Sequence, residues 1–505
     1  MGIPSYFKKL LQNYRSCSSR APPTDASILC YDFNCLIYRS LQGIKHIPYP
    51  TLGSPQEQFD SWEKTLLDEV KRTVEEVWVA SGRPRNVFLA VDGVVPMAKI
   101  RQQRVRRFKS AWLRKGGEET WDSNAITPGT VFMEKLDTML EGVCKEHRGW
   151  VLSGVKEEGE GEHKIMHWLR QIKKPKGPVI VYGLDADLIL LTLLTAEQTG
   201  FTLWLVRETQ EFEKQATEGY TFLQISELKE KLGLVSEREV INYIMVMAFM
   251  GNDFLPHSLS YTLKEDGHAL VLKQIEWMRT TGRWLVEREK DRWDLDPELF
   301  RTICGRFANG ETVQIEKNIA SKRKQAKFRG KGMDEQEYLP LLWDVEKCLV
   351  DARGSLKESW ETEYWKWIHP YPDEKEKVCK EYAKGFAWIL EYYTGQGNVP
   401  KDWMFPAWVP PLWKDLQSVK DEWLTLSKET KEKPILPQEQ LTMVLPLASW
   451  GLIRGAYKKV PAVAPQFWPE QMTFFSAGKR WFWECEALVP VLTAERLREI
   501  LNSEN

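Results

Sequence analysis

Short apolar runs alternate with amphipathic segments along residues 1–260. The runs at 28–31, 87–91 and 179–182 are continuous and rich in strand-forming residues. Runs of this kind are typical of parallel strands that are buried on both faces. The segments 59–79 and 132–144 carry apolar residues at helical spacing. This alternation predicts an α/β fold with a mainly parallel central sheet flanked by helices.

The pattern changes in the second half of the chain, where helical and loop patterns dominate. A basic stretch occupies 322–331, and we interpret it as a nuclear address or as a surface loop that touches RNA. A charged, tryptophan-rich stretch at 345–378 has the composition of a linker or a surface helix. The apolar run 386–390 and the proline- and tryptophan-rich run 400–413 follow. We therefore expect a C-terminal, mostly helical region beyond the α/β part.

Composition narrows the class of protein. The 505 residues carry a formal net charge of −1, so any site for a polyanion must come from local segregation of charge. The eight cysteines are scattered without zinc spacing, which indicates free thiols in a reducing compartment. Neither a transmembrane run nor a signal-peptide pattern is present. We expect a cytoplasmic protein with no membrane partner, and leave the nucleus and the virion as alternatives.

Aspartates stand at the end of each predicted strand. Asp32 and Asp92 end the first two runs, and Asp185 and Asp187 follow the third. Because parallel strands deliver their carboxyl ends to one edge of a sheet, these acids should meet there. A single aspartate at a strand end is more often a cap or turn residue, but capping alone does not explain the whole set.

Two more acidic clusters fit the same site. Glu160 and Glu162 lie in a glycine-rich turn before a helical run, and Asp253 follows the apolar helix 241–250. Crowded carboxylates need cations, and an all-oxygen set favours Mg²⁺ or Mn²⁺ over zinc. Paired metals of this kind cleave phosphodiesters. The sequence therefore predicts a site for two divalent ions.

A basic helix follows Asp92. Residues 99–115 contain many cations and no acid, and Lys99, Gln103, Arg106 and Arg107 share one helical face. Such runs are usually solvated surface, but in a near-neutral chain this one favours anion binding, and Arg and Lys suit a terminal phosphate.

These residues stand in a series of motifs. The series reads MGIP (1–4), DFN (32–34), VDGVVPMAK (91–99), QQRVRRF (102–108), DSNAITPGT (122–130), GEGEHKIM (159–166), YGLDADL (182–188) and GNDFLPH (251–257). Three later strings belong to the same series: GFAWILEYY (385–393), QLTMVLP (440–446) and WECEALVP (483–490). In this order they resemble the Xrn 5′→3′ exoribonucleases over almost the whole chain. The resemblance implies a 5′-nuclease (PIN-like) domain at 1–350 and a second region at 351–505 that packs against the active site.

The resemblance also implies roles for individual residues. The catalytic, metal-binding acids would be Asp32, Asp92, Glu160, Glu162, Asp185, Asp187 and Asp253. The pocket for the 5′-phosphate would consist of Lys99, Gln103, Arg106 and Arg107. The leading bases would stack between Tyr38, where the family has a histidine, and a tryptophan that best matches Trp403, with Trp408 as its rival.

The resulting hypothesis is a processive 5′→3′ exoribonuclease that degrades single-stranded RNA with a 5′-monophosphate to nucleoside 5′-monophosphates. One alternative is a flap-endonuclease-like DNA nuclease, which the run at 254–259 disfavours because it replaces a glycine-rich hairpin. The other is a repurposed Xrn-like protein with an RNA-binding or structural role. Loss of catalytic acids would indicate that case, and none is lost.

Overall fold

The computed structural model describes residues 6–114, 120–209, 219–325, 344–368, 374–397, 399–426, 433–479 and 481–503. Its strands are β1 (Ser18–Ser19), β2 (Ile28–Asp32), β3 (Asn86–Ala90), β4 (Trp150–Ser153), β5 (Val179–Tyr182), β6 (Leu203–Glu208), β7 (Tyr220–Gln224), β8 (Val286–Glu289), β9 (Arg292–Leu295), β10 (Phe474–Phe475) and β11 (Glu486–Ala487). The opening motif at 1–4 lies outside the described residues.

The described residues also form α-helices between four and 29 residues long. They are α1 (Tyr6–Asn13), α2 (Asn34–Gly43), α3 (Gln56–Ala80), α4 (Met97–Leu113), α5 (Val131–Glu146), α6 (Gly161–Gln171), α7 (Asp187–Thr199), α8 (Ile225–Lys231), α9 (Glu237–Ala248), α10 (His268–Thr281), α11 (Pro297–Gln325), α12 (Trp360–Ile368), α13 (Lys375–Thr394), α14 (Pro437–Val444), α15 (Val460–Val463) and α16 (Ala494–Asn502). None of the helices in the described part of the chain has the length and apolar character needed to span a bilayer.

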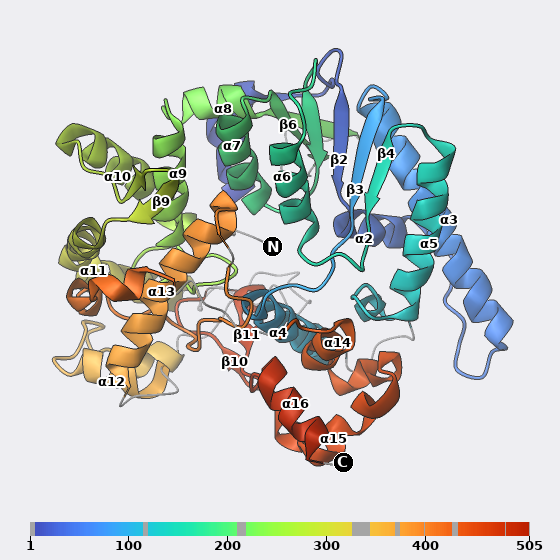
Figure 1. The fold of residues 1–505 in the computed structure, drawn as a ribbon. Coiled ribbons are helices and arrows are strands. Elements are labelled where there is room, and N and C mark those ends of the chain that lie inside the picture. Colours follow the sequence, from blue (N-terminus) through green and yellow to red (C-terminus); the bar gives the residue numbers. More distant parts are fainter. Residues whose placement is uncertain are drawn as a thin grey trace.

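A seven-stranded sheet organises the N-terminal half in the order β1-β7-β6-β5-β2-β3-β4 (Figure 1). Strands β2 to β6 run parallel to one another. At one edge, β7 pairs antiparallel with β6, and β1 pairs antiparallel with β7. The mainly parallel α/β sheet predicted from the sequence is confirmed. The three predicted runs became the adjacent strands β5, β2 and β3, and the two amphipathic segments became α3 and α5.

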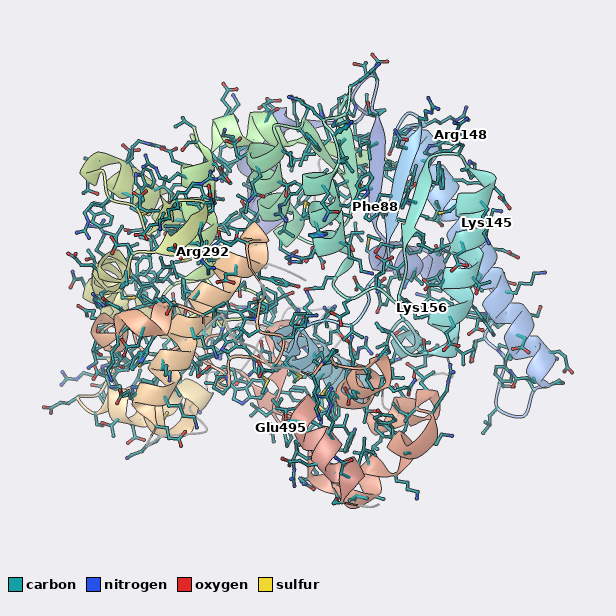
Figure 2. All side chains as sticks on the ribbon, in the orientation of Figure 1. Phe88, Lys145, Arg148, Lys156, Arg292 and Glu495 are labelled. Carbon is teal, nitrogen blue, oxygen red and sulfur yellow. The ribbon has the colours of Figure 1, made fainter. Side chains whose placement is uncertain are left out.

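Alternate residues of each strand face different helical layers. Cys30 and Phe88 point into a core shared with α6 and α7, where Phe88 stacks on Trp168 with ring centroids 4.5 Å apart. Leu29 and Leu89 point the other way, into a core shared with α2, α3 and α5. In Figure 2, Phe88 lies within the sheet while Lys145 and Arg148 lie at its outer edge. A sheet covered on both faces explains why the central strands read as continuous apolar runs.

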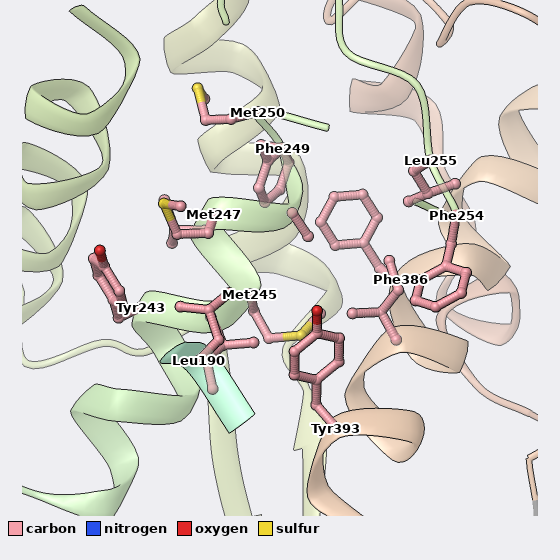
Figure 3. Packing of buried hydrophobic residues seen from close by; sticks show 14 of the residues in the cluster. Leu190, Tyr243, Met245, Met247, Phe249, Met250, Phe254, Leu255, Phe386 and Tyr393 are labelled. Atoms are coloured by element: carbon pink, nitrogen blue, oxygen red, sulfur yellow. The ribbon is translucent and has the colours of Figure 1, made fainter. Parts of the chain in front are cut away.

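The later part of the chain packs against the sheet domain. Phe249, just after α9, meets Phe386 of α13 with ring centroids 4.4 Å apart (Figure 3). This core fixes the loop that follows α9 relative to α13, and both contribute to the site described below. The predicted boundary at residue 350 stays a prediction.

The basic stretch at 322–331 is only partly described, and the described part is not a free surface. Lys322 is 3% exposed and forms a buried ion pair with Glu346, 2.7 Å apart. Lys322 therefore has a structural role, and neither interpretation of the stretch applies to it. Residues 326–331 lie outside the described residues.

Arg104 fixes α4 to the C-terminal segments. Arg104 is 1% exposed, and its guanidinium donates to the carbonyls of Met443, at 2.6 Å, of Pro490, at 3.0 Å, and of Phe467. Burial lowers the pKa of Arg104 to about 9. This cation of the basic helix thus supports the fold.

We expect Arg104→Met to lower the free energy of unfolding by on the order of 3 kcal/mol, because three buried carbonyls lose their donor. Urea unfolding measures the change, and Arg85→Met, at an exposed position before β3, is the control. Equal stability of the two variants would contradict the anchoring role.

Candidate active site

The carboxyl ends of three adjacent parallel strands form the site. Asp32 is the last residue of β2, and Asp92 follows β3. Asp185 follows β5, and Asp187 begins α7. Burial raises the pKa of Asp32 well above its ordinary value, and the charges of Asp92, Asp185, Asp187 and Glu160 raise it further. These acids therefore lie together at one edge of the sheet, as the sequence predicts.

The N-terminus of α6 fits tightly between two of the strand ends. The Gly161 amide donates to Asp92 Oδ1 at 2.7 Å. A Cβ at this glycine would lie 2.6 Å from the Ala90 carbonyl oxygen and 2.8 Å from Asp32 Oδ1. Only glycine allows this approach, which places Glu160 and Glu162 on either side of it against the aspartates.

Lys99 links the acids to the basic helix. Its ammonium lies 2.5 Å from Glu160 Oε2 and 3.0 Å from Asp253 Oδ2, and its side chain is 9% exposed. Burial alone would disfavour its charge, but these carboxylates raise the pKa of Lys99 well above its ordinary value. Burial alone would raise the pKa of Asp253, but the nearby Lys99 ammonium outweighs burial, and the pKa is lowered to about 2. Asp253 thus joins the cluster although it comes from the loop after α9.

Three of the acids, Asp92, Glu162 and Asp187, lack enough positive partners to offset burial. Burial, followed by the charge of Asp185, raises the pKa of Asp187 to about 7. Burial and the charge of Glu160 raise the pKa of Asp92 to about 6. Within the described residues, Glu162 Oε2 and Asp187 Oδ1 are buried without a hydrogen-bond partner. Orphaned carboxylate oxygens in a crowded acidic cluster are the donor set that hard divalent cations bind.

A histidine adds a nitrogen to this set. Ligand atoms of Glu160, Glu162 and His163 lie within 4.8 Å of one another. The His163 ring packs on Tyr392, with centroids 3.8 Å apart, and burial lowers its pKa well below the ordinary value. A neutral imidazole is available as a ligand, so the all-oxygen set expected from the sequence has one nitrogen at its edge.

The acids and the phosphate-binding candidates share one cavity of about 630 Å³. Its lining includes Asp32, Asp92, Glu160, Glu162 and Asp185 together with Tyr38, Lys99, Gln103, Arg106 and Arg107. Arg107 donates to Thr127 Oγ1 at 2.5 Å, and burial lowers its pKa to about 10. Arg106 is exposed and makes no hydrogen bond or ion pair within the described part of the chain. A free guanidinium beside an acidic cluster can accept an anionic ligand.

The two base-stacking candidates lie in different surroundings. Tyr38 is 47% exposed and lines the cavity. Trp403 is 4% exposed, donates to Glu381 Oε2 at 3.0 Å and packs on Trp388, and neither it nor its rival Trp408 lines this cavity. Its burial argues against the stacking role expected for Trp403, because a base has no access to the indole.

Comparison with known proteins gives a consistent result. The family model described as XRN 5′-3′ exonuclease N-terminus matches residues 1–209, and the one described as Xrn1 helical domain matches residues 358–504. The chain belongs to the Xrn family. Human 5′-3′ exoribonuclease 1 is 28% identical over 100% of this chain, and the Saccharomyces cerevisiae protein of that name is 26% identical over 99%. Gallus gallus 5′-3′ exoribonuclease 2 is 25% identical over 99%.

The relatives differ from this Xrn-family chain in length. The match covers 34% of the human protein, 43% of the yeast protein and 70% of the chicken protein. The chain therefore spans less than half the length of the human and yeast proteins.

Several residues of the Xrn site were not assigned a role from the sequence. Tyr392 of α13 donates to Glu160 Oε1 at 2.5 Å, and Asn34 accepts from the Asp92 amide at 3.2 Å. Lys164 donates to the Val91 and Gly154 carbonyls at 2.8 Å, which fixes α6 beside the strand end. Each of these three residues lies within a sequence motif that resembles the family, but only the tertiary contacts show which atom it orients.

Proposed function

We propose that this Xrn-family chain removes nucleoside 5′-monophosphates successively from the 5′ end of single-stranded RNA that carries a 5′-monophosphate. The observation that carries the proposal is the shared cavity, in which crowded carboxylates and the free Arg106 guanidinium face the same space. The printed names of the relatives, 5′-3′ exoribonucleases, support RNA as the polymer and the 5′ end as the start.

The acids are the proposed ligands of two Mg²⁺ or Mn²⁺ ions. Asp32, Asp92, Glu160, Glu162, Asp185, Asp187 and Asp253 offer carboxylate oxygens, two of them orphaned within the described residues. When bound, such ions supply Lewis-acid activation of water and stabilise charge on the leaving 3′-oxygen.

The chain's own residues position the RNA. Arg106 and Arg107 bind the terminal phosphate through charged N–H donors, and Gln103 adds an amide. Tyr38 offers an exposed ring on which the leading base stacks. Each cleavage leaves a new 5′-phosphate on the shortened RNA, so the recognised end is regenerated and processive degradation follows.

Release of a 5′ label tests the direction and the exonucleolytic mode. With Mg²⁺ and a single-stranded RNA labelled at its 5′-phosphate, we expect labelled mononucleotide at the earliest times. Labelled oligonucleotides would indicate an endonuclease, as in the flap-endonuclease alternative. RNA that is bound but not cut would favour the structural alternative.

Arg106→Gln tests recognition of the 5′ end. We expect cleavage of 5′-monophosphate RNA to fall about 10- to 100-fold, as for loss of a hydrogen bond to a charged group. The slow cleavage of 5′-hydroxyl RNA should not change, because that end offers no phosphate. Arg85→Gln, at the opposite end of the sheet, removes the same charge as a control. An equal loss on both RNAs would argue against the phosphate pocket.

A further inference from the structure

The amino ends of the parallel strands, opposite the acidic site, are basic. The loops that lead into β2 to β6 are 20–27, 81–85, 147–149, 172–178 and 200–202. They contain one acid, Asp25, and seven cations: Arg20, Arg83, Arg85, Arg148, Lys173, Lys174 and Lys176. The whole chain has 70 lysines and arginines against 71 aspartates and glutamates, so positive charge is concentrated at this edge.

Backbone hydrogen bonds hold these loops side by side. The Ser27 amide donates to the Pro178 carbonyl at 2.8 Å, and the Val87 amide donates to the Gly149 carbonyl at 3.1 Å. Neighbouring strands lie about 4.8 Å apart, so the loops before β4, β3, β2 and β5 form one row about 14 Å long. In Figure 2, Arg148 lies at one end of β4, and Lys156 lies beyond the other end.

Six of the cations are not neutralised by a carboxylate. They are exposed and form no ion pair in the described part of the chain, and we call them the basic edge: Arg83, Arg85, Arg148, Lys173, Lys174 and Lys176. Two acids on the adjoining helices have other partners. Glu146 lies 3.0 Å from Lys71, and Glu197 lies 2.7 Å from Lys229. A row of unpaired cations on one surface attracts a partner of opposite charge.

The aromatic rings near the basic edge pack on one another. His147 stacks on Trp150 with ring centroids 4.3 Å apart, and Trp78 meets both rings edge-on. Arg83 lies over the Trp78 ring, whose N–H donates to the Pro84 carbonyl at 2.9 Å. Proteins that bind single-stranded nucleic acid combine cations with open ring faces. These rings are engaged with their neighbours, so the surface offers charge without a platform for bases.

The basic edge is also separated from the catalytic cavity by the length of the sheet. Strand β2 runs from Ile28 at the basic edge to Asp32 at the cavity, a distance of about 17 Å for five residues. An RNA whose 5′ end lies in the cavity therefore starts at the opposite edge of the sheet.

We propose that the basic edge is a docking surface for a carboxylate-rich segment of a partner protein. Arginine and lysine pair strongly with carboxylates, which need no ring to stack on. Acidic side chains at positions i and i+4 of a helix lie about 5–6 Å apart, close to the spacing of the loops in the row. The proposal does not depend on the reaction in the catalytic cavity.

A labelled peptide of about ten glutamates tests the proposal, because it spans about 15 Å as a helix. Fluorescence anisotropy at low ionic strength in EDTA measures its binding. We expect the wild type to bind it, and the triple variant Lys173→Gln, Lys174→Gln and Lys176→Gln to bind about tenfold more weakly through loss of three exposed charge pairs. The triple variant should cleave 5′-monophosphate RNA like the wild type, since the two surfaces are separate.

A matched variant removes three exposed lysines from other surfaces, Lys45→Gln, Lys64→Gln and Lys459→Gln, and should bind the peptide like the wild type. Arg106→Gln should also bind it normally, and a loss there would place the peptide in the catalytic cavity and overturn the proposal. No binding by the wild type, equal weakening in both triple variants, or equal binding of a glutamine peptide of the same length would overturn it as well.

Single-stranded RNA with a 5′-hydroxyl, also in EDTA, is the rival ligand. We expect the wild type and the Lys173, Lys174 and Lys176 triple variant to have equal affinity for it. A tenfold loss of RNA affinity in the triple variant would identify the basic edge as an RNA-binding surface and overturn the proposal of an acidic protein partner.

Discussion

Asp187→Asn is expected to reduce cleavage of 5′-monophosphate RNA on the order of 1,000-fold, because it removes a charged ligand from the proposed metal site. The Asp187 side chain is buried and its Oδ1 lacks a hydrogen-bond partner within the described residues. Without divalent ions the same change should raise the free energy of unfolding by on the order of 2 kcal/mol at pH 8, since an unpaired buried charge is removed. Steady-state cleavage and urea unfolding in EDTA measure the two effects.

Asp68→Asn, on the exposed face of α3, is the control for removing an aspartate and should change neither quantity. Near-wild-type cleavage by Asp187→Asn would remove this residue from the metal site. Lower stability in EDTA would show that its carboxylate makes a favourable contact in the fold.

The acidic cluster also predicts how stability depends on pH when divalent ions are absent. The pKa of Asp187 rises from 3.8 to about 7 on folding, mainly through burial. The folded state therefore holds this proton more tightly, so the contribution of Asp187 to stability should be greatest below pH 4 and should be lost as the pH rises to about 7. At about 1.4 kcal/mol per pKa unit, Asp187 accounts for a decrease on the order of 4 kcal/mol. Saturating Mg²⁺ should reverse the decrease, and urea unfolding across this range with and without Mg²⁺ tests it.

Lys99→Met is expected to have the second large effect. The substitution leaves Glu160 and Asp253 buried without their shared ammonium, and breaking a buried ion pair in this way costs about 3–5 kcal/mol. Cleavage of 5′-monophosphate RNA should also fall steeply, because the residue connects the acids with the basic helix. Unfolding in EDTA measures the first effect, and a single-turnover cleavage assay measures the second.

A double variant separates the two roles of Lys99. Adding Asp253→Asn to Lys99→Met removes one of the stranded charges, so part of the lost stability should return while cleavage stays low. A double variant no more stable than Lys99→Met would contradict the assigned ion pair. Full activity in either variant would contradict the catalytic placement.

The acidic site could be predicted largely because its geometry is a consequence of local sequence. Asp32, Asp92 and Asp185 each follow a recognisable strand, and adjacent parallel strands must deliver their ends to one edge. Glycine at position 161 similarly marks the close approach of α6. Bringing these acids together requires only that the three strands be neighbours in the sheet, and β5, β2 and β3 are adjacent.

The other features of the site depend on tertiary packing, which no local sequence pattern predicts. Tyr392 reaches Glu160 from 232 residues away in sequence, through the packing of α13. Trp403 best matches the stacking tryptophan of the family, but it packs against Trp388 and is 4% exposed. Arg104 belongs to the same charge run as Arg106 but faces backbone carbonyls instead of the cavity. A charge run predicts a basic helix without indicating which of its cations remain free.

Digestion of one 3′-labelled single-stranded RNA with three different 5′ ends tests the central claim most directly. The ends are a monophosphate, a triphosphate and a hydroxyl, each assayed with Mg²⁺ and with EDTA. The shared cavity of carboxylates and free arginine predicts rapid loss of the monophosphate RNA alone, and only with Mg²⁺. Equal loss of all three RNAs, loss that persists in EDTA, or no loss of any RNA would contradict it.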